Sequence, residues 1–196
     1  MFLVRSVKRI RNFPDKIINR LSFIRFRPDC AEYPIINGRL RLYSGKGAKI
    51  RFGKNVRINS GMRFNPIGGD AVAILYAQPG ATISVGNNCG ISNSAIIARS
   101  SVVLEDDVMI GGGCKIYDND FHSIHYDERM QNPDPGIRSK PVLIRQGAFI
   151  GAHTIILKGV TVGRHSIIGA GSVVTHDIPD NEIWAGNPAV FVKKID

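Results

Sequence analysis

The segment 117–143 reads YDNDFHSIHYDERMQNPDPGIRSKPVL and gathers ionisable side chains that could carry acid–base chemistry. We expect His122 to be a general base, because an imidazole takes up and returns protons near neutral pH. Asp118 and Asp120 stand just before it, and a carboxylate can hold the second ring nitrogen and support the charged ring. We assign this orienting role to Asp120, since turn formation explains Asp118 equally well. His125 is the fallback base, and a merely polar surface loop is the alternative for the whole segment.

This segment interrupts a regular repeat of six residues. The longest run of aliphatic residues at this spacing is Ile144, Ile150, Ile156, Val162, Ile168 and Val174. The same step recurs at Leu104, Ile110 and Ile116, at Val85, Ile91 and Ile97, and more weakly at Phe52, Ile58 and Phe64. Four positions after each lead the residue is small or β-branched, as at Ala148, Thr154, Val160, Ser166 and Ser172.

A period of six fits neither the turn of an α-helix nor the two-residue alternation of a strand. It fits a coil of short strands joined by corners, in which each lead side chain stacks on its equivalent one coil away, about 4.8 Å along. The sequence therefore predicts a parallel β-helix. We expect the register to change between Val103 and Leu104 and around residues 65–78. A chance run of aliphatic residues in a β-sandwich is the alternative.

Composition bounds the class of protein. The 196 residues suit one domain with an arm, and a hydrophobic content of 43% excludes global disorder. No apolar run reaches the roughly 18 residues of a membrane span, and no secretory apolar region opens the chain, so we expect a cytoplasmic protein. The three cysteines lack CxxC spacing, which indicates neither a disulfide framework nor a cysteine-rich zinc site.

We expect a basic arm over 1–30, a β-helix over 31–180 with the loop 117–143, and a tail over 181–196.

The stretch 150–195, IGAHTIILKGVTVGRHSIIGAGSVVTHDIPDNEIWAGNPAVFVKKI, resembles the closing coils of the hexapeptide-repeat acyltransferases. The branch is that of the maltose, galactoside and xenobiotic acetyltransferases and of the surface-polysaccharide O-acetyltransferases. The likeness covers residues 81–194 well. It implies an all-β, left-handed parallel β-helix, homotrimers with active sites between subunits, and acetyl-CoA as acyl donor. The DNDFH motif implies that His122 is the base.

The resemblance also implies where the donor binds. The matching cofactor-binding positions are Phe149, Gly151, Ala152, Gly169, Ala170, Thr175, His176 and Lys193. Phe149 stands where the family often has Trp, and His176 where it usually has Lys, so these two assignments depart from the family pattern. Lys158 is a further candidate for a cofactor phosphate. A backbone N–H near Gly151 or Ala152 would stabilise a developing oxyanion.

The sequence offers two further candidate sites, one for the acceptor and one for a metal. Ser92 and Asn93 interrupt the coil with polar groups, so we place the acceptor near them. Coils of this kind also occur in zinc-dependent carbonic anhydrases, but stacked ligands would need separations near 18 residues. The intervals between His153, His165 and His176 are 12 and 11 residues, so we expect no metal site within one chain, and a zinc shared between subunits is the alternative.

Charge is concentrated in the first third of the chain. Residues 1–64 hold 16 of the 26 basic residues but only 3 of the 16 acidic ones. Within 1–28 the apolar positions Ile10, Phe13, Ile17, Ile18, Leu21 and Ile24 follow helical spacing. Such a helix could lie on an anionic membrane surface, or it could pack on a trimer or cap the first coil. No motif indicates nucleic-acid binding.

The leading hypothesis is an acetyl-CoA-dependent O-acetyltransferase acting on a sugar hydroxyl of a surface polysaccharide or its precursor. One alternative keeps the donor but changes the acceptor to an amine, a serine or a drug. The other is a non-catalytic trimeric scaffold, which the intact DNDFH and AGNPA motifs disfavour.

Overall fold

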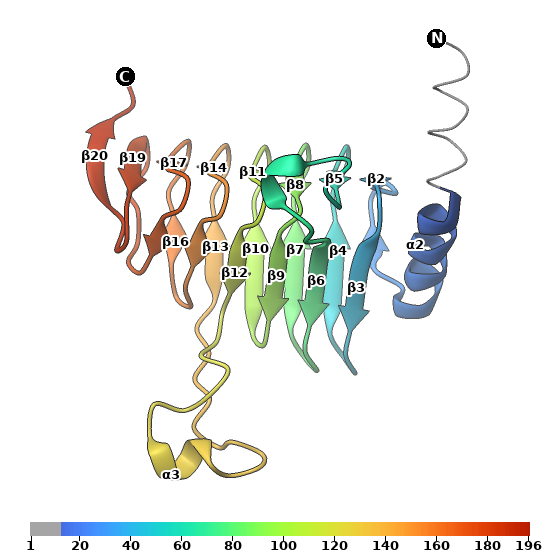
Figure 1. Ribbon diagram of the computed structural model, residues 1–196, viewed down its shortest axis with the longest axis horizontal. Helices are drawn as coiled ribbons and strands as arrows, with labels where there is room; N and C mark the ends of the chain where they lie inside the picture. The colour runs from blue at the N-terminus through green and yellow to red at the C-terminus, as the bar shows by residue number, and fades with distance from the viewer. Residues whose placement is uncertain (1–12) are drawn as a thin grey trace.

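The computed structural model describes residues 13–196, so residues 1–12 of the expected arm lie outside the described chain. The chain winds into a left-handed parallel β-helix with three sheets, as the repeat and the resemblance predicted. Figure 1 shows the coils stacked along the long axis, with a helix at the N-terminal end and a pair of strands at the C-terminal end.

Each coil contributes one strand to each sheet. Sheet A contains β1 (Asp29–Cys30), β4 (Lys49–Phe52), β7 (Thr82–Val85), β10 (Ser101–Leu104), β13 (Val142–Ile144) and β16 (Thr161–Val162). Sheet B contains β2 (Ile35–Asn37), β5 (Arg57–Asn59), β8 (Gly90–Ser92), β11 (Met109–Ile110), β14 (Phe149–Ile150), β17 (Ile167–Ile168), β19 (Glu182–Ala185) and β20 (Val190–Lys194). Sheet C contains β3 (Leu40–Ser44), β6 (Ala73–Ala77), β9 (Ala95–Ala98), β12 (Lys115–Tyr117), β15 (Ile155–Ile156) and β18 (Val173–Val174).

The core is the ladder of lead side chains that the repeat predicted. Ile144, Ile150, Ile156, Val162, Ile168 and Val174 are all fully buried, and so are the small residues at Ala148, Thr154, Ser166 and Ser172. Parallel pairing stacks each lead on its equivalent, as in Ile110 on Ile150 and Ile150 on Ile168. Apolar burial by this ladder supplies the main driving force for the fold.

Two assignments of the repeat were wrong. Ile96, not Ile97, points into the core and stacks between Leu75 and Ile116. The spacing of the lead residues shortens to five between Ile91 and Ile96, at the corner that contains Asn93, and lengthens to eight between Ile96 and Leu104. The expected change of register before Leu104 is therefore present, and a second change precedes Ile96. Phe64 does not occupy a lead position either. It lies in an excursion between β5 and β6.

Two segments leave the coil at different corners (Figure 1). Residues 60–72, with the short helix η1 (Pro66–Gly68), leave at the corner between sheets B and C. Residues 118–141, with α3 (Tyr126–Arg129), leave at the corner between sheets C and A. The second excursion is the one that the interrupted repeat predicted.

Helix α2 (Phe13–Phe26) closes the N-terminal end of the coil. The buried amide of Asn19 donates to the Gly38 carbonyl at 2.8 Å and accepts from the Leu40 N–H at 2.9 Å, which satisfies the open edge of the first coil. The rings of Phe23 and Phe52 stack with centroids 5.8 Å apart. One of the two alternatives for this segment, a helix that caps the coil, is therefore present.

At the other end, β19 pairs with β17 in parallel and with β20 in antiparallel, so the C-terminal segment extends sheet B. The division into arm, coil and tail at residues 30 and 180 stays a prediction. No helix in the described part of the chain is long and apolar enough to cross a membrane.

Candidate active site

His122 stands on the excursion 118–141, a few residues after β12 ends. The Asn119 side chain accepts the Phe121 N–H at 2.9 Å, and the His122 N–H donates to the Asp120 carbonyl at 2.7 Å. Phe121 adopts a φ of 62°, a conformation that non-glycine residues rarely take and that clusters at functional sites. These contacts fix a tight turn that presents the imidazole, whose side chain is 69% exposed.

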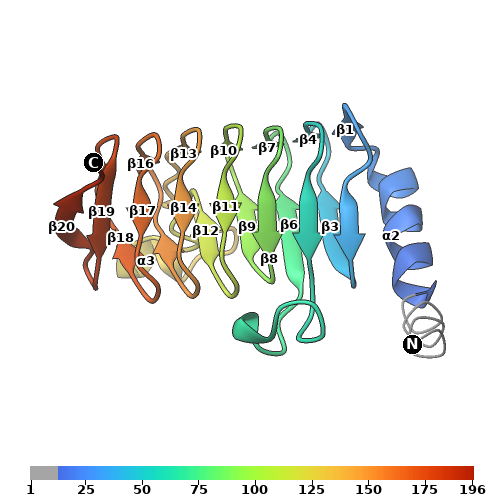
Figure 2. The same ribbon diagram turned by 90° about the horizontal axis from the view of Figure 1, so that it is seen from above.

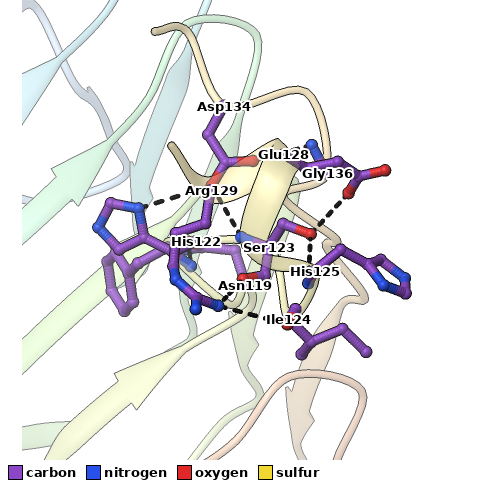
Figure 3. Close-up of polar contacts among 10 residues, drawn as sticks. Asn119, His122, Ser123, Ile124, His125, Glu128, Arg129, Asp134 and Gly136 are labelled. Atoms are coloured by element: carbon purple, nitrogen blue, oxygen red, sulfur yellow. Dashed lines mark hydrogen bonds and ion pairs between the residues drawn. The ribbon is translucent and has the colours of Figure 1, made fainter. Parts of the chain in front are cut away.

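The carboxylate that faces His122 is Asp134, not Asp120. Its Oδ2 lies 3.6 Å from Nδ1 of the imidazole, and its side chain is only 6% exposed (Figure 3). The same carboxylate accepts the Ser123 N–H at 2.8 Å and the Gly136 N–H at 2.9 Å. Burial alone raises the pKa of Asp134, but the two N–H donors and His122 outweigh it and hold the pKa below its ordinary value. Asp134 is therefore ionised at neutral pH.

A second set of contacts holds this loop together. The Ser123 hydroxyl donates to Glu128 at 2.6 Å and accepts the His125 N–H at 3.1 Å. The Arg129 guanidinium donates to the Ser123 carbonyl at 2.8 Å. In Figure 3 the His125 ring points away from the side on which His122 and Asp134 meet. The structure thus does not bring His125 to the site of His122.

Asp120 and Asp118 have other partners. Asp120 lies 2.6 Å from the Lys158 ammonium, so its carboxylate ties the start of the loop to the turn after β15. The buried Asp118 accepts the N–H groups of Arg99 and Ser100, both at 2.7 Å. The expectation that Asp120 orients His122 is thus not met within the chain, because Lys158 occupies its carboxylate. The role of Asp118 is therefore to accept these two backbone N–H groups, not to take part in catalysis.

A pocket of about 330 Å³ opens beside this turn. It is lined by Tyr117, Asn119, Asp120, Phe121, Leu157, Lys158 and Thr175. Of the residues expected to bind the donor, Thr175 and the further candidate Lys158 lie here. The Thr175 hydroxyl is 2.8 Å from Nδ1 of the neighbouring His176.

Four other expected donor-binding residues lie at the B–C corner, where 60–72 also leaves the coil. Gly151 and Gly169 allow successive coils to approach closely there, because neither has a Cβ. A Cβ on Gly151 would lie 2.6 Å from the Ala170 N, and one on Gly169 would lie 2.8 Å from the Ala185 Cβ. The Gly151 N–H is already bonded to the Ile168 carbonyl at 2.8 Å. Of the two expected oxyanion donors, this leaves the Ala152 N–H, beside the exposed Ala170, as the candidate.

Phe149 and Lys193 lie apart from both groups. Phe149 is 46% exposed on the outer face of sheet B, between Met109 and Ile167. Lys193 is exposed on β20, opposite Ile183. One protomer therefore distributes the expected donor contacts over two corners and one sheet face.

The acceptor assignment to Ser92 and Asn93 meets a structural obstacle. Asn93 is fully buried, donates to the Asn65 carbonyl at 2.7 Å and accepts the Gly61 N–H. Its side chain anchors the excursion 60–72 and is not accessible to a sugar. Ser92 uses its carbonyl to accept the Ser94 hydroxyl at 2.7 Å. Both residues lie at the B–C corner, whereas His122 leaves from the C–A corner.

The histidines considered as metal ligands occupy corners. His153 and His165 have φ values of 61° and 54°, and the His153 ring lies 2.8 Å from the Ile67 carbonyl. Across residues 13–196, no three His, Cys, Asp or Glu side chains gather as a metal site would require.

Comparison with known proteins agrees with the fold. Residues 141–176 match the family model for the bacterial transferase hexapeptide (six repeats). Galactoside O-acetyltransferase of Escherichia coli strain K12 is 33% identical over 123 residues, which are 62% of this chain and 59% of that protein. The putative lipopolysaccharide biosynthesis O-acetyl transferase WbbJ of the same strain is 28% identical over 80% of this chain and 77% of its own. The chain thus spans less than two thirds of the first of these relatives.

Among solved structures, a galactoside acetyltransferase in complex with coenzyme A superimposes with a TM-score of 0.53 and 25% identity, over 80% of this chain and 66% of that one. The coil, the six-residue repeat and these relatives all agree with the resemblance to the hexapeptide-repeat acyltransferases.

Proposed function

We propose that the protein transfers an acetyl group from acetyl-CoA to a sugar hydroxyl, in a surface polysaccharide or its precursor. The observation that carries the proposal is the exposed His122 imidazole facing the buried Asp134 carboxylate on an excursion of a hexapeptide coil. Relatives named galactoside and lipopolysaccharide O-acetyltransferases support a sugar hydroxyl as acceptor, and a structural neighbour with bound coenzyme A supports the donor.

In this proposal each nitrogen of His122 has its own role. Nδ1 faces Asp134, so Nε2 is left to face the acceptor. His122 Nε2 takes the proton of the acceptor hydroxyl, and the acceptor oxygen attacks the carbonyl carbon of the thioester. The new C–O bond replaces the C–S bond, and His122 returns its proton to the departing thiolate. Asp134 supports the imidazolium while the proton is held, and the Ala152 N–H stabilises the charge on the carbonyl oxygen.

The homotrimer belongs to the same proposal. The base leaves the coil at the C–A corner, whereas Gly151, Ala152 and Ala170 lie at the B–C corner. A second copy whose B–C corner meets the first copy's C–A corner would complete the site, which gives each active site residues from two protomers.

Hybrid trimers test this arrangement. His122→Ala removes the base, and Ala152→Glu places a bulky carboxylate at the donor corner of otherwise intact protomers. If each site takes its base and its donor corner from different copies, mixing the two inactive variants one to one restores about a quarter of the activity, because each mixed trimer has one intact site. A site built within a single protomer predicts no recovery.

The proposed location is cytoplasmic and peripheral to the inner face of the membrane, with residues 1–28 as the contact. The abundance of Lys and Arg in the first third of the chain supports it.

Release of free thiol from acetyl-CoA tests the reaction itself. The full-length protein is offered galactosides, maltose and other sugars, with serine, an aminoglycoside and water as comparisons. The proposal predicts turnover that depends on a sugar. Turnover with the amine or serine alone supports the alternative acceptors, and donor binding without any turnover supports a scaffold.

A further inference from the structure

Helix α2 has two apolar faces, of which the coil uses one. Asn19 is buried and Phe23 packs against the core, as described above. Ile17, Leu21 and Ile24 are 46%, 59% and 64% exposed. Since successive residues of an α-helix turn by about 100°, these three fall on one stripe about half a turn from Asn19 and Phe23. The stripe has no partner in the described part of the chain.

The place of the helix leaves this stripe open. Both views show α2 lying across the N-terminal end of the coil, with no strand on its outer side (Figures 1 and 2). A contiguous row of large aliphatic side chains exposed on a helix that is itself firmly anchored is typical of an interaction surface. Packing against the coil uses only the opposite face of α2, so it does not account for this row.

Cations flank the stripe on both sides. Lys16 and Arg20 are exposed on one flank and Arg25 on the other. The one carboxylate of the helix, Asp15, turns toward the opposite side of the helix at about 100° per residue. An apolar row between two cationic rows matches the interface of an anionic bilayer. The apolar side chains would be buried among the acyl chains, and the cations would bind the headgroup phosphates.

Space for a headgroup lies beside the cations. Lys16 and Arg20 line a pocket of about 420 Å³ together with Asn19, Tyr33, Pro34, Ile35, Ile36 and Asn37. Tyr33 and Ile35 are themselves 43% and 44% exposed. The pocket therefore offers two positive groups and an apolar wall next to the stripe.

We propose that the outward face of α2, defined by Ile17, Leu21, Ile24, Lys16, Arg20 and Arg25, lies on the surface of an anionic phospholipid bilayer. The proposal rests on the peripheral location given under the proposed function and names the surface that makes the contact. The two expectations for the N-terminal helix are then both met, one on each face. The inner face caps the first coil and the outer face holds the enzyme at the membrane.

Flotation with phospholipid vesicles tests the contact. Full-length protein is mixed with vesicles of phosphatidylcholine alone or with phosphatidylglycerol added, and the bound fraction is measured against lipid concentration. The wild type should bind the anionic vesicles and not the neutral ones. Ile17→Gln/Leu21→Gln/Ile24→Gln should weaken binding about 100-fold, because three half-exposed aliphatic side chains lose their apolar environment. Arg20→Gln/Arg25→Gln should cost about fivefold for each cation removed.

A matched control replaces three exposed aliphatic residues elsewhere, as Ile67→Gln/Val190→Gln/Val192→Gln, and should bind as the wild type does. Residues 1–12 are intact in every variant, so the comparison isolates the face of α2. Equal binding by the α2 triple variant and the wild type overturns the proposal, as does absence of wild-type binding. A change in oligomeric state caused by the α2 triple variant also overturns it, because the face would then join copies of the chain. Thiol release with a soluble sugar is measured in parallel and should not change, so loss of the membrane contact is distinguishable from failure of the proposed reaction.

Discussion

Replacement of Asp134 by Asn tests how the site prepares its base. The change keeps the shape of the side chain but removes the charge 3.6 Å from the His122 imidazole, and it leaves one of the Ser123 and Gly136 N–H groups without its acceptor. The attraction energy between two unit charges at this distance corresponds to a factor of about ten in rate in bulk water. At an effective dielectric constant of about 20 it corresponds to a factor of about a thousand. Since His122 is 69% exposed in one protomer, we expect kcat to fall about ten- to a hundredfold.

The assay is thiol release from acetyl-CoA with a sugar acceptor, and the KM for acetyl-CoA should stay within about twofold, because Asp134 supports the imidazolium, which forms only during transfer. Glu128→Gln is the matched control. It removes the charge of the carboxylate that lies 2.6 Å from the Ser123 hydroxyl in the same loop and leaves the pair of Asp134 and His122 in place, so its kcat should change little. Asp120→Asn should also have little effect on kcat. If Glu128→Gln or Asp120→Asn loses as much activity as Asp134→Asn, the loop contributes through its folding, and the reasoning from charge is wrong.

Three further predictions concern the coil and its corners. Gly151→Ala should destabilise the protein by about 1–3 kcal/mol in thermal or urea unfolding, because its Cβ would lie 2.6 Å from the Ala170 N; an unchanged midpoint contradicts the packing argument. Asp118→Ala should cost about 3 kcal/mol, since two buried backbone N–H groups lose a charged acceptor at 2.7 Å, and Asp118→Asn should cost less. Burial raises the pKa of Cys89 from 9.0 to about 11, so its contribution to stability is complete below pH 9 and is lost as the pH rises toward 11; the alkaline fall of Tm should be smaller in Cys89→Ala, and an identical fall would refute the assignment.

The fold was accessible from the sequence because its repeat is one-dimensional. A lead aliphatic every six residues can only be buried by stacking coils, so Ile144 to Val174 are placed correctly by period alone. The prediction was wrong at Ile97 and Phe64, where the period is broken by the corner at Asn93 and by the excursion 60–72. Local backbone geometry, which no period encodes, decided both positions.

The candidate site was accessible only in part. The interrupted repeat indicates the loop and the resemblance indicates His122. Asp134 was missed because it lies twelve residues further along an irregular loop, and nearness in sequence favoured Asp120. Its place between Pro133 and Pro135, just before Gly136, was the available signal, since such a segment forms a rigid turn that can aim one side chain. Asn93 was misassigned because a polar residue that breaks a repeat can equally serve to anchor the chain that leaves it.

The central claim is that His122 accepts the proton of a sugar hydroxyl during acetyl transfer. The most direct measurement compares thiol release by the wild type and by His122→Ala at saturating acetyl-CoA, with the best sugar of the panel and with equal thermal stability confirmed for both proteins. The account predicts that turnover falls roughly 100- to 10,000-fold while binding of acetyl-CoA is retained. Turnover by His122→Ala within threefold of the wild type would contradict it.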